Sequence, residues 1–161
     1  MAQIDDAYPR LNRSYRNRFS FRLATTSFIY PDRILPNVQA LAPFMDEIEI
    51  LLFEKKSPPS AEEILQVKTV LAASETTANV HLPLDIELAG SDPENRRRDA
   101  ELVRRRIEQT LPWQPTTYCL HIGPAPAQPD KAALEKWRRR AAESLTELLQ
   151  TPPAPRQFAV E

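Results

Sequence analysis

Two kinds of hydrophobic pattern alternate along this chain. Short apolar, β-branched runs typical of strands lie at residues 21–30, 47–54, 77–85, 116–123 and 156–161. Between these runs, apolar residues recur at three- and four-residue spacing, which predicts helices beginning near Ile34, Ser60, Pro93 and Asp130. Five strands alternating with four helices predict an α/β protein with a parallel sheet, because parallel neighbours need a crossover connection.

The helical segments also carry start signals and apolar faces. Ser60 and Glu63 form a capping-box pattern, and Asp92-Pro93 supplies an N-cap followed by a first-turn proline. The spacing predicts that the following residues face inward: Ile64, Val67 and Leu71 in the second helix, Ala100, Val103, Ile107 and Leu111 in the third, and Leu134, Trp137, Ala141, Leu145 and Leu148 in the last.

The residues that share a face of each predicted strand limit the possible architectures. On the third strand Asn79 and His81 share one face, and on the fourth Cys119 and His121 do the same, while the intervening residues are apolar. A sheet with one apolar face and one small or polar face fits a barrel lumen better than an open doubly wound sheet. The pattern therefore predicts a partial (β/α)8 TIM barrel of about five parallel strands and four helices.

The two histidines of the chain are candidate metal ligands. His81 and His121 lie at matching places in successive predicted strands, and Glu161 occupies the equivalent place in the last one. Imidazole and carboxylate groups are common ligands of divalent metals. A structural alternative also stays open, in which each histidine is a hydrogen-bonded residue with no role in metal binding. Cys119 could coordinate as a thiolate, but the inert, small hydrophobic role is favoured.

Composition excludes several other classes. Hydrophobic residues make up 42%, charged residues 27%, and the net charge is -1, so no polycationic or polyanionic partner is indicated. With one cysteine, no export leader and no apolar run of ~20 residues, we expect a cytoplasmic protein without a membrane span. The arginine clusters at 96–98, 104–106 and 138–140 are interleaved with acidic residues, which favours solvated helix faces over nucleic-acid binding.

These residues also carry a family resemblance. The sequence resembles the xylose isomerase-like TIM barrels, which include the AP endonuclease 2 family and whose metal centre takes a histidine, a histidine and a glutamate from strands three, four and five. His81, His121 and Glu161 match those positions. The runs TTSFIYPDRILPNV, EIEILLFE and VHLPLDIEL are most similar to the cobamide-remodelling phosphodiesterases.

The resemblance covers residues 20–161 and implies an enzyme that hydrolyses the nucleotide-loop phosphodiester of cobamides with a divalent ion such as Zn or Mn. Its partner would then be a small-molecule cobamide substrate. Four further residues near predicted strand ends are candidates for substrate binding: Ser27, Tyr30, Glu54 and Asp85. Two alternatives stay open, a sugar or sugar-phosphate isomerase or epimerase of the same superfamily and a non-catalytic truncated remnant.

The length of the chain shapes the domain prediction. A barrel of this family has eight strands and ~250 residues, whereas the last predicted strand here is the fifth. We therefore expect a polar N-terminal lead at residues 1–18 and, at residues 19–161, a single incomplete domain forming the N-terminal portion of a truncated barrel. Such a fragment is expected to lack full activity, and to self-associate or be complemented by a missing C-terminal half.

Overall fold

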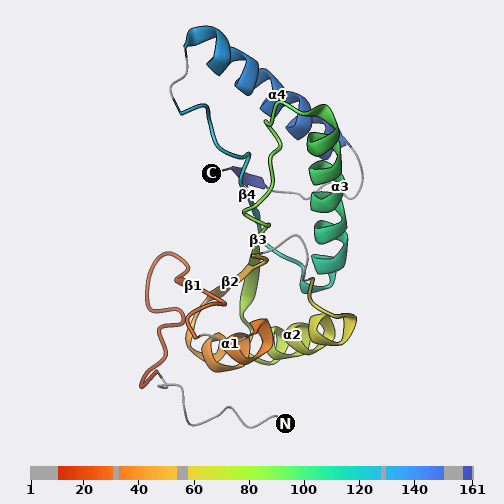
Figure 1. The fold of residues 1–161 in the computed structure, drawn as a ribbon. Helices are drawn as coiled ribbons and strands as arrows, with labels where there is room; N and C mark the ends of the chain where they lie inside the picture. The colour runs from red at the N-terminus through yellow and green to blue at the C-terminus, as the bar shows by residue number, and fades with distance from the viewer. Residues whose placement is uncertain (1–10, 31–32, 54–57, 128–129, 151–157, 161) are drawn as a thin grey trace. The chain divides into compact units, whose positions relative to one another are not determined.

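The computed structural model describes residues 11–30, 33–53, 58–127, 130–150 and 158–160, and over these residues the protein is α/β as predicted (Figure 1). Five strands each run parallel to their partners, and four α-helices and two short 3₁₀ helices connect them. Their bounds, in chain order, are β1 Ala24–Thr26, α1 Ile34–Leu41, η1 Ala42–Phe44, β2 Glu47–Leu51, α2 Ala61–Ala73, β3 Thr77–His81, α3 Pro93–Thr110, η2 Leu111–Trp113, β4 Tyr118–Leu120, α4 Lys131–Gln150 and β5 Phe158–Val160.

The described residues divide into two compact units. The first combines the residues up to Leu51 with Pro59–His81 and Thr110–Thr116, and it contains β1, β2 and β3. The second contains α3, β4, α4 and β5. The prediction that residues 19–161 form one incomplete domain stays a prediction.

The core of the first unit lies on one face of its sheet. Ile48 and Ile50 on β2, and Ala78 and Val80 on β3, are buried at alternating positions and pair across the two strands. Helices α1 and α2 lie side by side (Figure 1) and contribute further buried side chains: Val38, Leu41, Ile64, Val67 and Leu71. The apolar stripe predicted for the second helix is therefore confirmed.

Trp113 packs the η2 turn against this core. Its ring is buried, and its Nε1–H donates a hydrogen bond to the carbonyl oxygen of Ile64 at 2.8 Å. A buried indole usually finds such a partner for its N–H. Trp113 therefore belongs to the core of the first unit.

Helix α2 starts where the sequence indicates. The Ser60 hydroxyl accepts a hydrogen bond from the Glu63 N–H at 3.1 Å, which satisfies a donor that the first turn leaves without an intrahelical partner. The Glu63 carboxylate accepts a hydrogen bond from the Leu35 N–H of α1 at 3.5 Å. Ser60 thus fixes the start of the helix, and Glu63 links α2 to α1.

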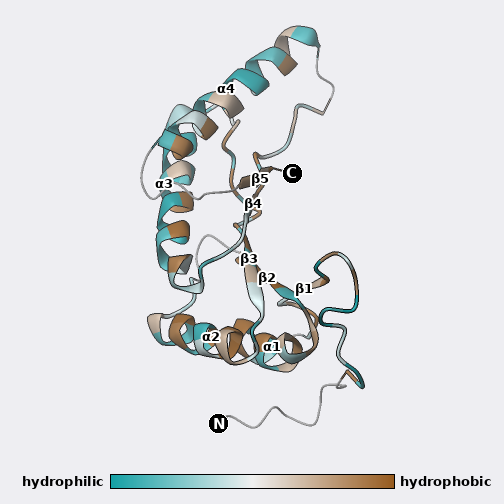
Figure 2. Ribbon diagram, turned by 180° about the vertical axis from the view of Figure 1, so that it is seen from behind, coloured by the Kyte–Doolittle hydropathy of each residue, from teal (hydrophilic) through white to brown (hydrophobic). Residues whose placement is uncertain are grey.

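In the second unit, the inward residues of α3 follow the prediction with one exception. Ala100, Val103 and Ile107 are buried, and Figure 2 shows apolar residues along an otherwise hydrophilic helix. Leu111, predicted to face inward, is 43% exposed. The reason is that α3 ends at Thr110 and the chain continues as a tighter 3₁₀ turn, which changes the direction of the next side chain.

The arginines of α3 correct a second expectation. Arg104 bonds Glu147 of α4 at 2.7 Å and Glu101 at 3.2 Å, and the hydrogen bond to Glu147 raises the pKa of Arg104. Arg106 is buried, and that burial lowers its pKa. Arg104 therefore links α3 to α4, and Arg106 is buried, so neither guanidinium lies on a solvated helix face.

The strands are shorter than the apolar runs suggest. The first was expected over residues 21–30, but only Ala24–Thr26 pair with β2. The N–H of Leu23, just before β1, donates to the side chain of Asp46 at 2.8 Å, so the strand ladder begins after it. No helix in the described part of the chain is both long and apolar enough to cross a bilayer.

Candidate metal centre at the carboxyl ends of the strands

In the first unit, the carboxyl ends of three parallel strands are tied together. The Ser27 N–H donates to the carbonyl of Glu49 at 2.8 Å, and the Leu51 N–H donates to the Ser27 hydroxyl at 3.1 Å. Leu51 in turn pairs with His81 across β2 and β3. Ser27 and His81, both predicted site residues, therefore lie at the same edge of this sheet, and both are buried.

His81 belongs to the polar face of this sheet. Parallel partners present their side chains to the same face, and Glu47, Glu49, Thr77 and Asn79 alternate with the buried apolar residues in phase with His81. The parity that the sequence indicates for Asn79 and His81 is thus realised. The imidazole lies where a barrel lumen would place a ligand.

A buried carboxylate, that of Glu47, lies on the same face at the amino end of β2, and the sequence analysis did not predict it. Glu47 is 8% exposed and accepts hydrogen bonds from the Thr116 hydroxyl at 2.6 Å, the Asn79 amide at 3.1 Å and the Thr77 hydroxyl at 3.2 Å. Arg22 forms an ion pair with it at 3.5 Å. A buried charge needs such partners, and the presence of a glutamate inside a strand pattern was the available signal.

This network orients Asn79, two residues before His81. Its Nδ2 is committed to Glu47, and its Oδ1 is buried with no hydrogen-bond partner among the described residues. Most buried polar side-chain atoms in proteins have a hydrogen-bond partner. The polar face therefore retains one hydrogen-bonding position close to the predicted ligand.

In the second unit, His121 directly follows β4 and is half-buried. Cys119 pairs with Ala159, and Leu120 pairs with Val160 of β5. The N–H of Leu82, the residue after His81, donates to the carbonyl of Cys119 at 2.9 Å. Within the second unit, Leu82 thus lies beside Cys119 of β4.

Gly123 allows the chain to turn just beyond His121. Its φ is +100°, and a Cβ there would lie 3.1 Å from the Glu87 Cα and 3.2 Å from the Ile86 carbonyl oxygen. Both the backbone angle and the close approach require glycine. The Ala89 N–H donates to the Ile122 carbonyl at 3.1 Å and holds the same segment.

Of the remaining predicted site residues, two belong to the described part of the chain and two do not. The Tyr30 N–H donates to Asn37 Oδ1 at 2.9 Å, and the Asn37 amide donates back to the Tyr30 carbonyl at 3.2 Å, so this loop is bound to α1. Asp85 is exposed on the second unit. Glu54 and Glu161 lie outside the described residues.

The donor set suits a divalent ion only in part. The described residues contain no group of three or more His, Cys, Asp or Glu side chains that could hold a metal. They contribute two imidazoles, His81 in the first unit and His121 in the second, each at the carboxyl end of a strand. Their joint ligation of one ion with Glu161 stays a prediction.

Comparison with known proteins gives no match to a family model and none to a curated protein sequence. Solved structures do match. A D-tagatose 3-epimerase-like protein aligns with a TM-score of 0.65 and 14% identity over 87% of this chain and 52% of its own. A D-psicose 3-epimerase gives 0.64 and 16% over 80% and 47%. The 3-keto-D-glucoside 4-epimerase of E. coli gives 0.59 and 16% over 80% and 49%.

These likenesses define the fold. The neighbours are TIM barrels of the xylose isomerase-like type, and this chain shares the architecture of about half the length of each. The predicted partial TIM barrel is therefore confirmed as a fold. The three neighbours are epimerases, so their likeness fits the xylose isomerase-like fold and gives no support to the expected closeness to cobamide phosphodiesterases.

Proposed function

We propose that this chain forms part of a metal-dependent sugar epimerase or isomerase built on the xylose isomerase-like TIM barrel. The observation that carries the proposal is the fold likeness to the three epimerases described above. The chain spans about half the length of those proteins, so the whole enzyme would need further strands. In TIM barrels the active site lies at the carboxyl ends of the strands, which is where His81 and His121 lie.

The side chains proposed for this site have distinct roles. His81 and His121 would hold a divalent ion through neutral imidazole nitrogens, and Glu161 would add a carboxylate. The ion, when bound, supplies Lewis-acid polarisation of a substrate oxygen. Asn79, with its buried Oδ1, would accept a hydrogen bond from a substrate hydroxyl or a bound water. Ser27, Tyr30, Glu54 and Asp85 stay candidates for substrate contact.

A second candidate function is hydrolysis of the nucleotide-loop phosphodiester of a cobamide. It is favoured by the resemblance of TTSFIYPDRILPNV and VHLPLDIEL to the cobamide-remodelling phosphodiesterases. The same donors would serve it, because a divalent ion can bind a phosphoryl oxygen and lower the pKa of a bound water. The two candidates thus share a site and differ in substrate.

Parallel substrate assays separate them. The purified chain is incubated with Mn²⁺, Co²⁺ or Zn²⁺ and either D-tagatose or D-psicose, and the sugars are separated by chromatography. A second series uses a cobamide, and mass spectrometry detects loss of its nucleotide. The His81→Ala/His121→Ala double variant is the control in both.

Appearance of an epimer that depends on metal and on the two histidines supports the main proposal. Nucleotide loss with the same dependence overturns it in favour of the phosphodiesterase. Absence of both reactions, in this chain and in a complex with strands supplied on a second polypeptide, leaves the non-catalytic remnant.

A further inference from the structure

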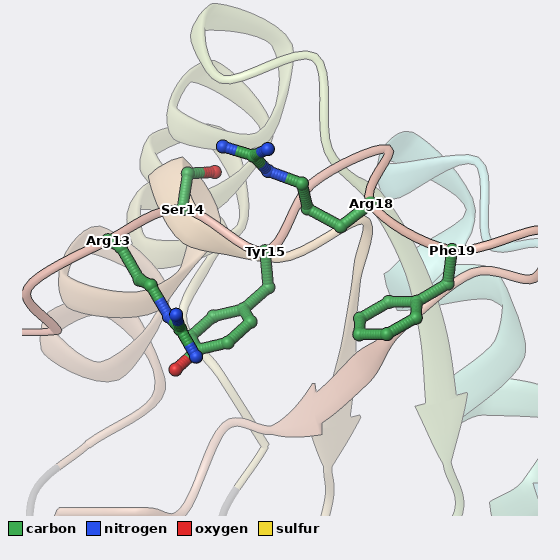
Figure 3. Close-up of a pocket in the computed structure, with 5 residues that line it drawn as sticks. All are labelled: Arg13, Ser14, Tyr15, Arg18 and Phe19. Atoms are coloured by element: carbon green, nitrogen blue, oxygen red, sulfur yellow. The ribbon is translucent and has the colours of Figure 1, made fainter.

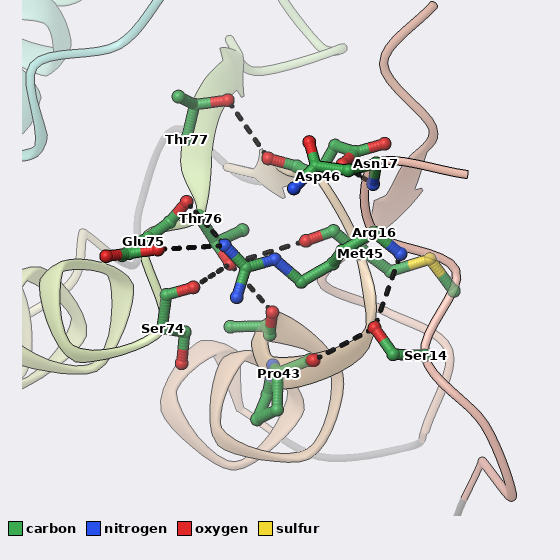
Figure 4. Close-up of polar contacts among 11 residues, drawn as sticks. Ser14, Arg16, Asn17, Pro43, Met45, Asp46, Ser74, Glu75, Thr76 and Thr77 are labelled. Atoms are coloured by element: carbon green, nitrogen blue, oxygen red, sulfur yellow. Dashed lines mark hydrogen bonds and ion pairs between the residues drawn. The ribbon is translucent and has the colours of Figure 1, made fainter. Parts of the chain in front are cut away.

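The described part of the N-terminal lead is bound to the amino end of the first unit's sheet. The Tyr15 N–H donates to the Phe44 carbonyl at 2.9 Å, and the Asn17 and Leu23 N–H groups each donate to the Asp46 carboxylate at 2.8 Å. Figure 4 shows Asn17 beside Asp46 in this cluster of contacts. Asp46 directly precedes β2, whereas His81 ends β3, so the lead lies at the opposite end of the strands from the candidate metal ligand.

The lead has a local excess of positive charge. No acidic residue occurs from Ala7 to Pro31, and five arginines do. Arg16 contacts Glu75 and Arg22 contacts Glu47. Arg13 and Arg18 form no ion pair with any residue of the described chain, so two guanidiniums remain to attract an anion.

These two arginines line a surface pocket of about 280 Å³ together with Ser14, Tyr15 and Phe19. The Arg13 guanidinium lies over the Tyr15 ring, 5.0 Å from its centroid. Figure 3 shows the Arg18 side chain extending toward the side of the Ser14 hydroxyl, while the Tyr15 and Phe19 rings lie on the other side. One part of the pocket is thus formed by Arg18 and Ser14, and the other is aromatic and includes Arg13. The Ser14 hydroxyl donates to the Pro43 carbonyl at 3.5 Å and accepts from the Arg16 N–H at 3.3 Å.

The aromatic part is exposed and ordered by stacking. Phe19 is 49% exposed and Phe21 is 61% exposed, and their rings stack with centroids 5.1 Å apart and planes 13° apart. A planar group can extend such a stack, and bases bind aromatic side chains in this way. An anion without a ring would leave this surface unused.

We propose that this pocket binds a phosphate ester that carries a planar ring. The phosphate contacts the Arg18 guanidinium, and the ring packs on Phe19 in the aromatic part, where Arg13 adds positive charge beside Tyr15. The same chemistry is present in a free mononucleotide and in a single-stranded nucleic acid. This site is separate from the proposed metal centre and does not depend on the proposed function.

Calorimetric titration without added metal tests the proposal. The probes are adenosine 5′-monophosphate, adenosine and inorganic phosphate, with an oligothymidylate to distinguish a polymer from a free nucleotide. The monophosphate is expected to bind more tightly than adenosine or phosphate. Arg13→Gln/Arg18→Gln should weaken it about tenfold. Phe19→Ala should weaken the monophosphate but not inorganic phosphate.

A matched control removes the same charge elsewhere. Arg138 and Arg139 are exposed on α4 in ion pairs with Glu135 and Glu143, and Arg138→Gln/Arg139→Gln should leave binding unchanged. Equal weakening by both double variants would overturn the proposal, because net charge alone would explain it. Binding of phosphate as tight as that of the monophosphate would also overturn it, as would binding to anionic vesicles with no binding of the monophosphate. Saturable monophosphate binding supports a free nucleotide, and tighter oligothymidylate binding supports the polymer.

Discussion

At the scale of single residues, Glu47 shows how the polar face of the sheet accommodates a buried charge. Three donors from β3 and the segment before β4 converge on its carboxylate, and Arg22 balances the charge from the exposed side. Because the same contacts orient Asn79, stability and site geometry are linked at this residue.

Removing this carboxylate should therefore be costly. We expect Glu47→Ala to lower the free energy of unfolding by about 2–3 kcal/mol, because buried donors lose their acceptor. Urea denaturation followed by circular dichroism measures the loss. Glu49→Ala, which removes a half-buried carboxylate from the same face one row away, is the control and should cost less than half as much. Equal losses would mean that the hydrogen bonds of Glu47 contribute nothing specific.

Asp46 predicts a pH dependence. Hydrogen bonds from the Leu23 and Asn17 N–H groups hold the pKa of this carboxyl below its usual 3.8, with further help from Arg16 and Arg22. A depressed folded-state pKa stabilises the protein above the unfolded pKa, and the contribution disappears as pH falls through the folded pKa. Asp46→Asn should therefore destabilise the chain at neutral pH, and its effect should disappear as the pH falls through the lowered pKa of Asp46.

Unfolding midpoints of both proteins across this range provide the measurement, with exposed Asp85→Asn as the matched charge change. A destabilisation by Asp46→Asn that is the same at both ends of the pH range would exclude the ionised carboxylate as its cause.

Some residues of the site could be predicted from sequence and others could not. His81 could be predicted because the alternation of residues along a strand fixes the face on which it lies. Ser27 could be predicted because it follows a strand. The burial of Glu47 and Arg106 could not be predicted, because it depends on residues that are distant in the sequence. Glu47 is bonded to Thr116, and Arg106 is buried by the residues packed around its helix. Pattern alone assigns charged residues to solvent.

The N-terminal lead illustrates a signal that the polar pattern conceals. Residues 1–18 read as a polar extension, yet from Ala7 to Phe19 arginines are interleaved with aromatic residues and no acidic residue occurs. Basic residues with interleaved aromatics were the pointer to the pocket. What the sequence could not supply was which arginines are neutralised by Glu75 and Glu47.

At the scale of elements, helices were better predicted than strands. The start of α2 follows from the Ser60 side chain, and its buried face follows from the 3.6-residue period. The apolar runs around β1 and β4 extend beyond the paired residues, since a strand ends where its hydrogen bonds go to side chains or loops and not where its apolar residues stop.

The N-cap of α2 offers a direct test at this scale. Ser60→Ala should lower the free energy of unfolding by about 1 kcal/mol, because the Glu63 N–H loses its acceptor. Ser74→Ala at the other end of α2 is the control and should change stability by a few tenths of a kcal/mol at most. Thermal or urea denaturation compares the two. A smaller effect of Ser60→Ala than of Ser74→Ala would contradict the assigned cap.

At the scale of the whole molecule, the chain covers about half of each epimerase that it resembles in fold. The remaining ligands of a complete metal centre would come from further strands.

The central claim is that His81 and His121 bind one divalent ion at the carboxyl ends of the strands. Calorimetric titration of Zn²⁺ and Mn²⁺ into the chain, its two single histidine-to-alanine variants and Cys119→Ser tests this claim most directly. The account predicts one ion per chain, loss of more than about tenfold in affinity in either histidine variant, and unchanged affinity in Cys119→Ser. Metal binding that survives loss of both histidines, or that disappears only with Cys119, would contradict it.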